Sequence, residues 1–137
     1  MEAKEVKKEE KLEKSVKIRS TVYEVEIKDG KLCASETNYP MPGYGNNYGT
    51  EYVVDTTYSK RWAKLEINCW NNTYATRGHG MTDFWSDGVG YVRRKEAEEF
   101  IKTVKEELER AENGTPDVLE VFGKVRDFVQ EKIGEDY

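Results

Sequence analysis

Apolar and polar residues alternate through most of the first two thirds of the chain, as they do in strands that bury one face. The pattern recurs in five stretches followed by a shorter sixth one: 16–28, 31–36, 51–58, 61–70, 73–77 and 89–92. Asp29-Gly30 between the first two stretches has the composition of a two-residue hairpin turn. We therefore predict an antiparallel sheet of four to five strands over about residues 16–92.

The last third of the chain has a helical repeat instead. Apolar residues recur every three or four positions in 93–112, and again after the Asn113-Gly114 and Thr115-Pro116 breaks. Two antiparallel helices joined by a short turn cover one face of a sheet. The predicted fold class is α+β, with an antiparallel sheet and two C-terminal amphipathic helices packed on one face. The second face is left for water or a partner.

Charge divides the chain into parts. Residues 1–15 carry five lysines and five glutamates, which predicts a charged flexible tail before a single α+β domain at 16–137. The net charge of −5 resides in the helical part, because residues 96–137 contain 6 basic and 13 acidic residues while 16–95 contain 11 and 9. A mildly basic strand region is compatible with a nucleic-acid partner. The Glu and Lys bias is typical of hyperthermophile proteins.

Few residues suggest catalysis or metal binding. Cys33 and Cys69 are the only cysteines, and their pattern fits two buried thiols or one disulfide. The chain has a single histidine, His79, which argues against a zinc site, so we expect no metal and no cofactor. The Arg77–Gly88 loop also holds Asp83 and Asp87, but its spacing matches no known mechanism. We expect no catalytic residue, and a small enzyme centred on this loop is the weakest of the functional readings.

No apolar stretch is long enough to span a membrane, and the N-terminus lacks the apolar segment of a signal peptide. We therefore expect a cytoplasmic protein with no membrane partner.

The stretch 61–70 carries the functional hypothesis. Its odd positions are apolar, whereas its even positions mix aromatic, charged and amide side chains: Trp62, Lys64, Glu66, Asn68 and Trp70. Alternate residues of a strand point to the same side. The pattern therefore predicts two tryptophans on the sheet face that the helices leave open.

Aromatic rings beside basic groups on a sheet suit single-stranded DNA or RNA, because unpaired bases stack on rings while phosphates meet cations. The predicted stacking residues are Trp62, Trp70 and Tyr74, with Tyr52 and Tyr58 in support and Trp85 in a clamping loop. The predicted phosphate contacts are Lys60, Arg61, Lys64 and Arg77. The alternatives are a homodimer or partner interface on the same aromatic face, or aromatic packing within the monomer.

Residues 88–92, Gly-Val-Gly-Tyr-Val, lead directly into the acidic helical run that begins Arg93-Arg94-Lys95-Glu96. This layout resembles the strand-to-helix junction of Whirly-type and ThermoDBP-like single-stranded DNA-binding domains, over about residues 16–112. The resemblance implies a four-stranded sheet backed by helices, bases bound on aromatic and basic sheet residues, and a homodimer.

Overall fold

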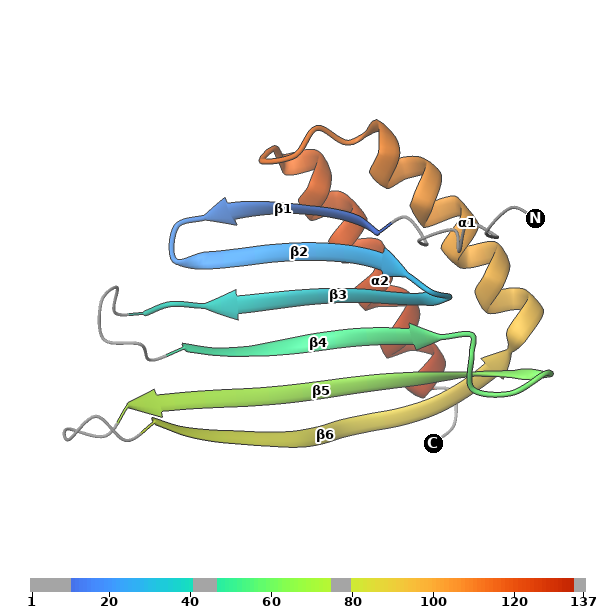
Figure 1. Cartoon of the computed structure of the whole chain (residues 1–137), viewed down its shortest axis with the longest axis horizontal. Coiled ribbons are helices and arrows are strands. Elements are labelled where there is room, and N and C mark those ends of the chain that lie inside the picture. The colour runs from blue at the N-terminus through green and yellow to red at the C-terminus, as the bar shows by residue number, and fades with distance from the viewer. Residues whose placement is uncertain (1–10, 41–46, 75–79, 135–137) are drawn as a thin grey trace, which may run out of the picture.

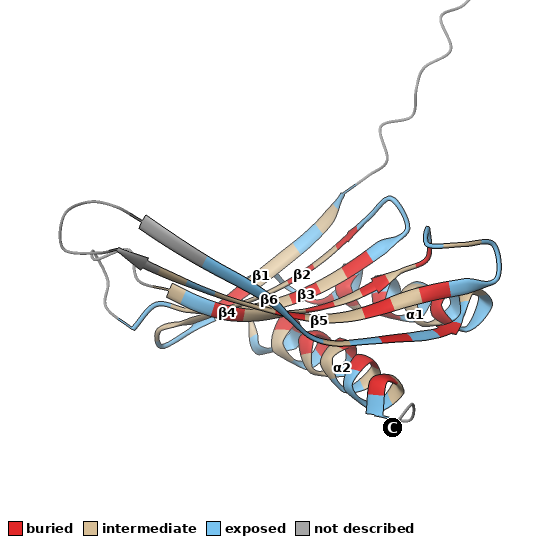
Figure 2. Ribbon diagram, turned by 90° about the horizontal axis from the view of Figure 1, so that it is seen from below, coloured by how far each residue is buried: buried red, intermediate tan, exposed pale blue. Residues whose placement is uncertain are grey.

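The computed structural model describes residues 11–40, 47–74 and 80–134, with side chains except at 73, 74 and 80–82. Six strands pair in chain order as one antiparallel meander: β1 (Leu12–Ile18), β2 (Thr21–Lys28), β3 (Lys31–Asn38), β4 (Asn47–Asp55), β5 (Trp62–Tyr74) and β6 (Gly80–Arg93). Two helices follow, α1 (Arg94–Arg110) and α2 (Pro116–Gly134), and both lie on one side of the sheet (Figure 1, Figure 2). The α+β class is confirmed, whereas four to five strands is an undercount.

The predicted strand at 16–28 is two strands. β1 begins at Leu12, inside the predicted tail, and a turn at Arg19-Ser20 returns the chain as β2. Arg19 has a positive φ of 57°, a conformation that non-glycine residues seldom adopt. The turn therefore contains no glycine or asparagine that would indicate it in the sequence. The change of apolar face near residues 19–21, which sequence reasoning treats as a bend, is the hairpin itself.

β5 and β6 form a longer hairpin than the pattern predicts. β5 continues through Asn71-Asn72, the break between two predicted strands, and β6 covers most of the stretch 78–88, which belongs to the predicted loop. Strand pairing here overrides glycine and asparagine content, since β6 has β5 as a partner along its whole length. The register shifts opposite Ile67 and Asn68, so that Asp87 is an extra residue in β6.

The core lies between the sheet and the helices. Phe122 of α2 is completely buried, and its ring meets Tyr23 and Tyr52 edge-on, with centroids 5.1 Å and 6.0 Å away. Truncating such a residue to alanine costs about 3–5 kcal/mol. Helix α1 contributes Ala97, Val104 and Leu108. Because both helices pack on this side, no helix of the described residues lies on the far side of the sheet, here called the open face (Figure 2).

The two cysteines are free thiols and lie on opposite faces of the sheet. A disulfide between them is therefore excluded in this fold. Neither helix in the described part of the chain is long and apolar enough to cross a membrane.

Candidate nucleic-acid interface

The open face is built by the alternation that the sequence predicts for β5. Ala63 and Leu65 are buried towards the helices, so Trp62, Lys64, Glu66, Asn68 and Trp70 project to the other side. Both tryptophans therefore lie on one face, as expected. They lie at opposite ends of it, since eight residues of strand span roughly 26 Å. One oligonucleotide base cannot touch both rings.

Aromatic rings and cations gather at the Trp62 end. The Tyr58 and Tyr91 rings lie 5.2 Å apart, and the Lys64 ammonium is 6.0 Å from the Tyr58 ring centre. The Arg93 guanidinium is 4.6 Å from the centre of the Trp62 ring. Register explains this gathering, because β5 and β6 place Trp62 opposite Arg93 and Lys64 opposite Tyr91. The three aromatic side chains are all exposed, and Trp62 retains 40% of its accessible surface.

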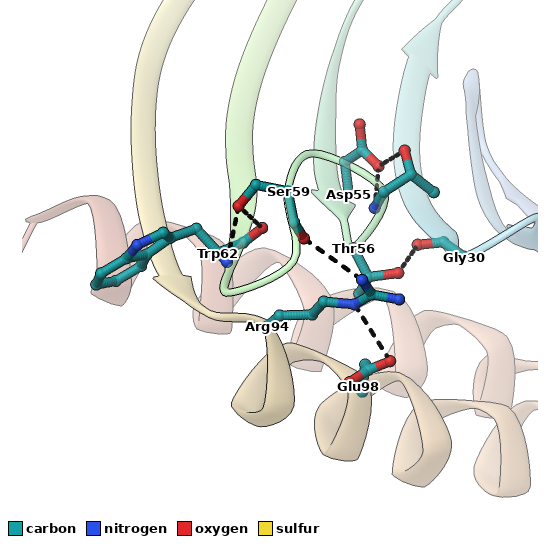
Figure 3. Close-up of polar contacts among 8 residues, drawn as sticks. Gly30, Asp55, Thr56, Ser59, Trp62, Arg94 and Glu98 are labelled. Carbon is teal, nitrogen blue, oxygen red and sulfur yellow. Dashed lines mark hydrogen bonds and ion pairs between the residues drawn. The ribbon is translucent and has the colours of Figure 1, made fainter.

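Hydrogen bonds fix the turn that carries Trp62 (Figure 3). The Trp62 N–H donates to Ser59 Oγ at 3.0 Å, and the Ser59 N–H donates to the Trp62 carbonyl at 3.2 Å. Arg94 reaches beneath the turn, where its guanidinium meets the Ser59 carbonyl and Glu98, each at 3.5 Å. The turn is therefore tied to the first turn of α1, and the position of Trp62 is set by both.

A neighbouring turn supports this one. Thr56 donates to the Gly30 carbonyl through its N–H at 3.0 Å and its hydroxyl at 2.6 Å (Figure 3). Gly30 has a φ of +77°, and a Cβ there would lie 2.8 Å from the Thr56 hydroxyl oxygen. Glycine at position 30 is therefore required by conformation and by space.

A pocket rich in cations adjoins Trp62, where the turn meets the start of α1. Its volume is about 580 Å³, and its lining is Lys60, Arg61, Arg93, Arg94, Lys95 and Glu98. Five cations thus surround one carboxylate. We call this pocket, together with Tyr58, Trp62 and Tyr91, the cationic corner. Its positive charge and its rings match what phosphates and bases require.

Carboxylates occur on the open face midway along several strands, from β1 and β2 to β4 and β5. Carboxylate oxygens of Glu13, Glu24 and Glu26 lie within 4.8 Å of one another. Partial burial, together with repulsion from Glu13 and Glu26, raises the pKa of the Glu24 carboxyl. Lys11 pairs with Glu13 at 2.7 Å, which offsets part of the repulsion. We call these three glutamates, together with Glu51 on β4 and Glu66 on β5, the acidic middle.

A hydrogen-bonded chain continues the acidic middle across β4 and β5. The buried Asn68 amide donates to Glu51 and to Glu66, each at 3.0 Å, and Glu66 also pairs with Lys64 at 3.0 Å. Hydrogen bonds from Asn68 and then Lys64 lower the pKa of the Glu66 carboxyl. Burial and the nearby Glu51 carboxylate raise the pKa of the Cys33 thiol, which favours its protonated form.

The Trp70 end is different again. Trp70 is half-buried, because its indole lies on the backbone of Gly49 in β4. A Cβ at position 49 would collide with that indole and with the Glu36 carbonyl oxygen. Phe84 lies opposite Trp70 on β6 and is well exposed. Apolar surface is present at this end, but no cluster of cations accompanies it among the described residues.

The predicted site residues therefore divide. Trp62, Tyr58, Lys60 and Arg61 belong to the cationic corner and Lys64 lies next to its Tyr58 ring, whereas Trp70 lies at the far end of the face. Tyr52 is misplaced by the prediction: it faces the helices, is 5% exposed and packs on Phe122. Trp85 is exposed, but lies opposite Cys69 and so points to the other face. The Tyr74 side chain, Arg77 and His79 lie outside the described residues.

Sequence reasoning missed half of the corner. Tyr91, Arg93, Arg94 and Lys95 form a run at the strand-to-helix junction, where three adjacent basic residues are a visible signal. Because these basic residues begin a predicted helix, the sequence pattern indicates a structural role for them. Only the pairing of β5 with β6 reveals that this run adjoins Trp62.

The described residues add no observation in favour of the enzyme hypothesis. His79 lies outside the described residues, and Asp83 and Asp87 are exposed side chains on an edge strand. No catalytic constellation can be built from the two carboxylates alone.

Comparisons with models of protein families, with curated proteins and with solved structures found no match to this chain. The resemblance to Whirly-type and ThermoDBP-like domains stays a prediction.

Proposed function

We propose that this protein binds single-stranded nucleic acid at the cationic corner. The observation that carries the proposal is the meeting of three exposed aromatic rings with a pocket of five cations and one carboxylate. Neither part is sufficient alone, because rings without cations fit many apolar partners. Cations without rings would fit any anion.

Trp62 is the proposed stacking ring. Arg93 lies against it at 4.6 Å, which keeps the indole in place while 40% of its surface stays open to a base. Stacking a base on an aromatic side chain is worth about 1–3 kcal/mol. Tyr58 and Tyr91, which contact each other, offer a second apolar surface for the adjacent base.

The acidic middle limits the length of strand that can bind. Its five carboxylates would repel a phosphate backbone that continued across β2, β3 and β4. The bound segment is therefore a few nucleotides at the corner, in contrast to the face-wide platform that the sequence pattern predicts.

Single strands fit this surface better than duplexes, because their bases are free to leave the stack and meet protein rings.

Fluorescence anisotropy with an end-labelled oligo-dT tests the proposal. Wild type should bind at low salt, and Trp62→Ala should weaken binding by about 1–3 kcal/mol, the value of one stacked base. Trp85→Ala is the matched control, since Trp85 has a similar exposure of 46% and faces the other side of the sheet. It should bind as wild type does.

Equal losses in the two variants, or no binding at about 100 μM protein in low salt, would remove the proposal. A large loss in Trp70→Ala as well would move the site from the corner to the whole face.

A second candidate is self-association through the β6 edge. The other edge strand, β1, is covered: its Ser15 N–H donates to Asn113 Oδ1 at 2.7 Å, and the Gly114 N–H donates to the Ser15 carbonyl at 2.8 Å. No described strand or loop covers β6 in this way. Four large exposed apolar side chains lie along it: Phe84, Trp85, Val89 and Tyr91. Such edges pair with other chains.

Sedimentation velocity tests this candidate. A homodimer that Phe84→Lys/Val89→Lys dissociates, and that Trp62→Ala leaves intact, would support the β6 edge as the interface. A wild-type monomer at about 100 μM would exclude it as a stable interface.

A further inference from the structure

The pocket of the cationic corner holds more positive charge than its own contacts use. Arg94 is engaged with Glu98 and the Ser59 carbonyl, and Arg93 lies against Trp62. Lys60, Arg61 and Lys95 line the same pocket and form no ion pair within residues 11–40, 47–74 and 80–134. Three cations are therefore available to a ligand in one hollow of about 580 Å³.

An internal phosphate of a nucleic-acid strand is a poor match for this excess, because a phosphodiester carries one negative charge. A terminal phosphomonoester carries about −1.5 to −2 at neutral pH and presents three acceptor oxygens. Two lysines and an arginine suit that group, since arginine donates as a fork and lysine as a point charge.

The pocket also lies at one end of the open face, beside Trp62. It is bounded by the β4–β5 turn and by the first turn of α1. Figure 3 shows Trp62 and the Arg94 guanidinium on opposite sides of the β4–β5 turn. Arg93 belongs both to the pocket lining and to the Trp62 stack, so a nucleotide on the indole has its phosphate group within reach of the pocket. In the other direction lies the acidic middle.

We propose that the pocket selects a strand end, binding the terminal phosphomonoester of single-stranded DNA or RNA while the adjoining base stacks on Trp62. This inference rests on the proposed function and specifies which part of the strand the corner recognises.

Three oligo-dT probes of one length test it: one with a 5′-phosphate, one with a 3′-phosphate and one with hydroxyls at both ends, each labelled at an internal thymine. One of the phosphorylated probes should bind at least about fivefold more tightly than the hydroxyl probe, the factor that one extra charge 4 Å from a cation gives in water. The preference should shrink below about pH 6, where the phosphomonoester loses its second charge.

Lys60→Gln/Lys95→Gln should abolish the preference and leave residual binding of the hydroxyl probe. Both side chains are exposed, so the fold should tolerate the change. Lys102→Gln/Lys105→Gln is the control, with the same loss of charge on an exposed part of α1 outside the pocket lining. It should keep the preference.

Three probes that bind wild type equally well would overturn the terminal selection and leave the proposed function standing. A preference that survives in Lys60→Gln/Lys95→Gln would also overturn it, because the selectivity would then arise elsewhere. Failure of all three probes to bind would instead count against the proposed function itself.

Discussion

The cationic corner and the acidic middle are neighbouring regions of one sheet face with opposite chemistry. In the corner, cations outnumber carboxylates five to one around the pocket. In the middle, three glutamates from β1 and β2 lie within 4.8 Å of one another, and Glu51 and Glu66 share one buried amide. A face defined by strand alternation is therefore not uniform in charge. Charge divides it into a region that attracts a polyanion and one that repels it.

The largest effect should come from reversing the charge of the corner. Arg61→Glu/Lys95→Glu should weaken oligo-dT binding by more than about tenfold, since it places two negative charges where phosphates are proposed to lie. It should also make the slope of log affinity against log salt concentration shallower by about 1.4, or 0.7 for each lost phosphate contact of a single strand. Salt titrations by anisotropy measure both quantities.

The control for that reversal is Lys102→Glu/Lys105→Glu, which makes the same change of net charge elsewhere on α1. If the two double variants lose affinity equally, overall charge governs binding and the division of the face has no functional meaning.

An intermediate effect, on stability, should come from the amide that joins two carboxylates of the acidic middle. Asn68→Ala removes both donors from Glu51 and Glu66, which should lower the free energy of unfolding by about 1–3 kcal/mol. Urea denaturation measures this. Asn71→Ala, an exposed position on the same strand, should change little. Affinity for the oligonucleotide should be unaltered in Asn68→Ala, and a parallel loss of binding would show that the two regions are coupled.

The smallest effect concerns Glu24. Its folded-state pKa is raised by burial and by Glu13 and Glu26, so the folded protein holds this proton more tightly than the unfolded chain does. The free energy of unfolding should therefore fall as pH rises from about 4.3, the unfolded value, through the raised folded value. Glu24→Gln should remove this part of the pH dependence and stabilise the neutral-pH fold by less than about 1 kcal/mol, because solvent screens charges that are this exposed.

Thermal unfolding of both proteins across that pH range checks the prediction. Identical pH profiles would mean that the glutamates of the acidic middle do not repel one another in the folded state.

Much of the architecture is readable from the sequence, because local pattern determines it. Helical spacing of residues such as Val104 and Leu108 predicts α1, and Asp29-Gly30 predicts the β2–β3 turn; both predictions are confirmed. The alternation in β5 correctly places both tryptophans on the open face. The Arg19 turn and the glycine-containing β6 were missed, because strand pairing outweighs local composition there.

The site is harder to predict from the sequence, because segments that are distant along the chain form it. The corner joins 58–62 to 91–95 through the pairing of Trp62 with Arg93, which no local pattern contains. Tyr52 was wrongly grouped with Tyr58 by extending an alternation past Asp55, where β4 ends. Beyond a strand end, residue parity no longer indicates the face.

Trp70 packs on Gly49, whereas Trp62 is open to solvent, so the two tryptophans of β5 have different surroundings. The half-buried indole at 70 senses the packing of β4 against β5, so its emission should respond to unfolding. The indole at 62, beside Arg93 and open to solvent, should respond to an occupant of the corner instead. With Trp85 replaced, variants that retain only one of these two fluorophores would follow folding and ligand capture separately, without any added dye.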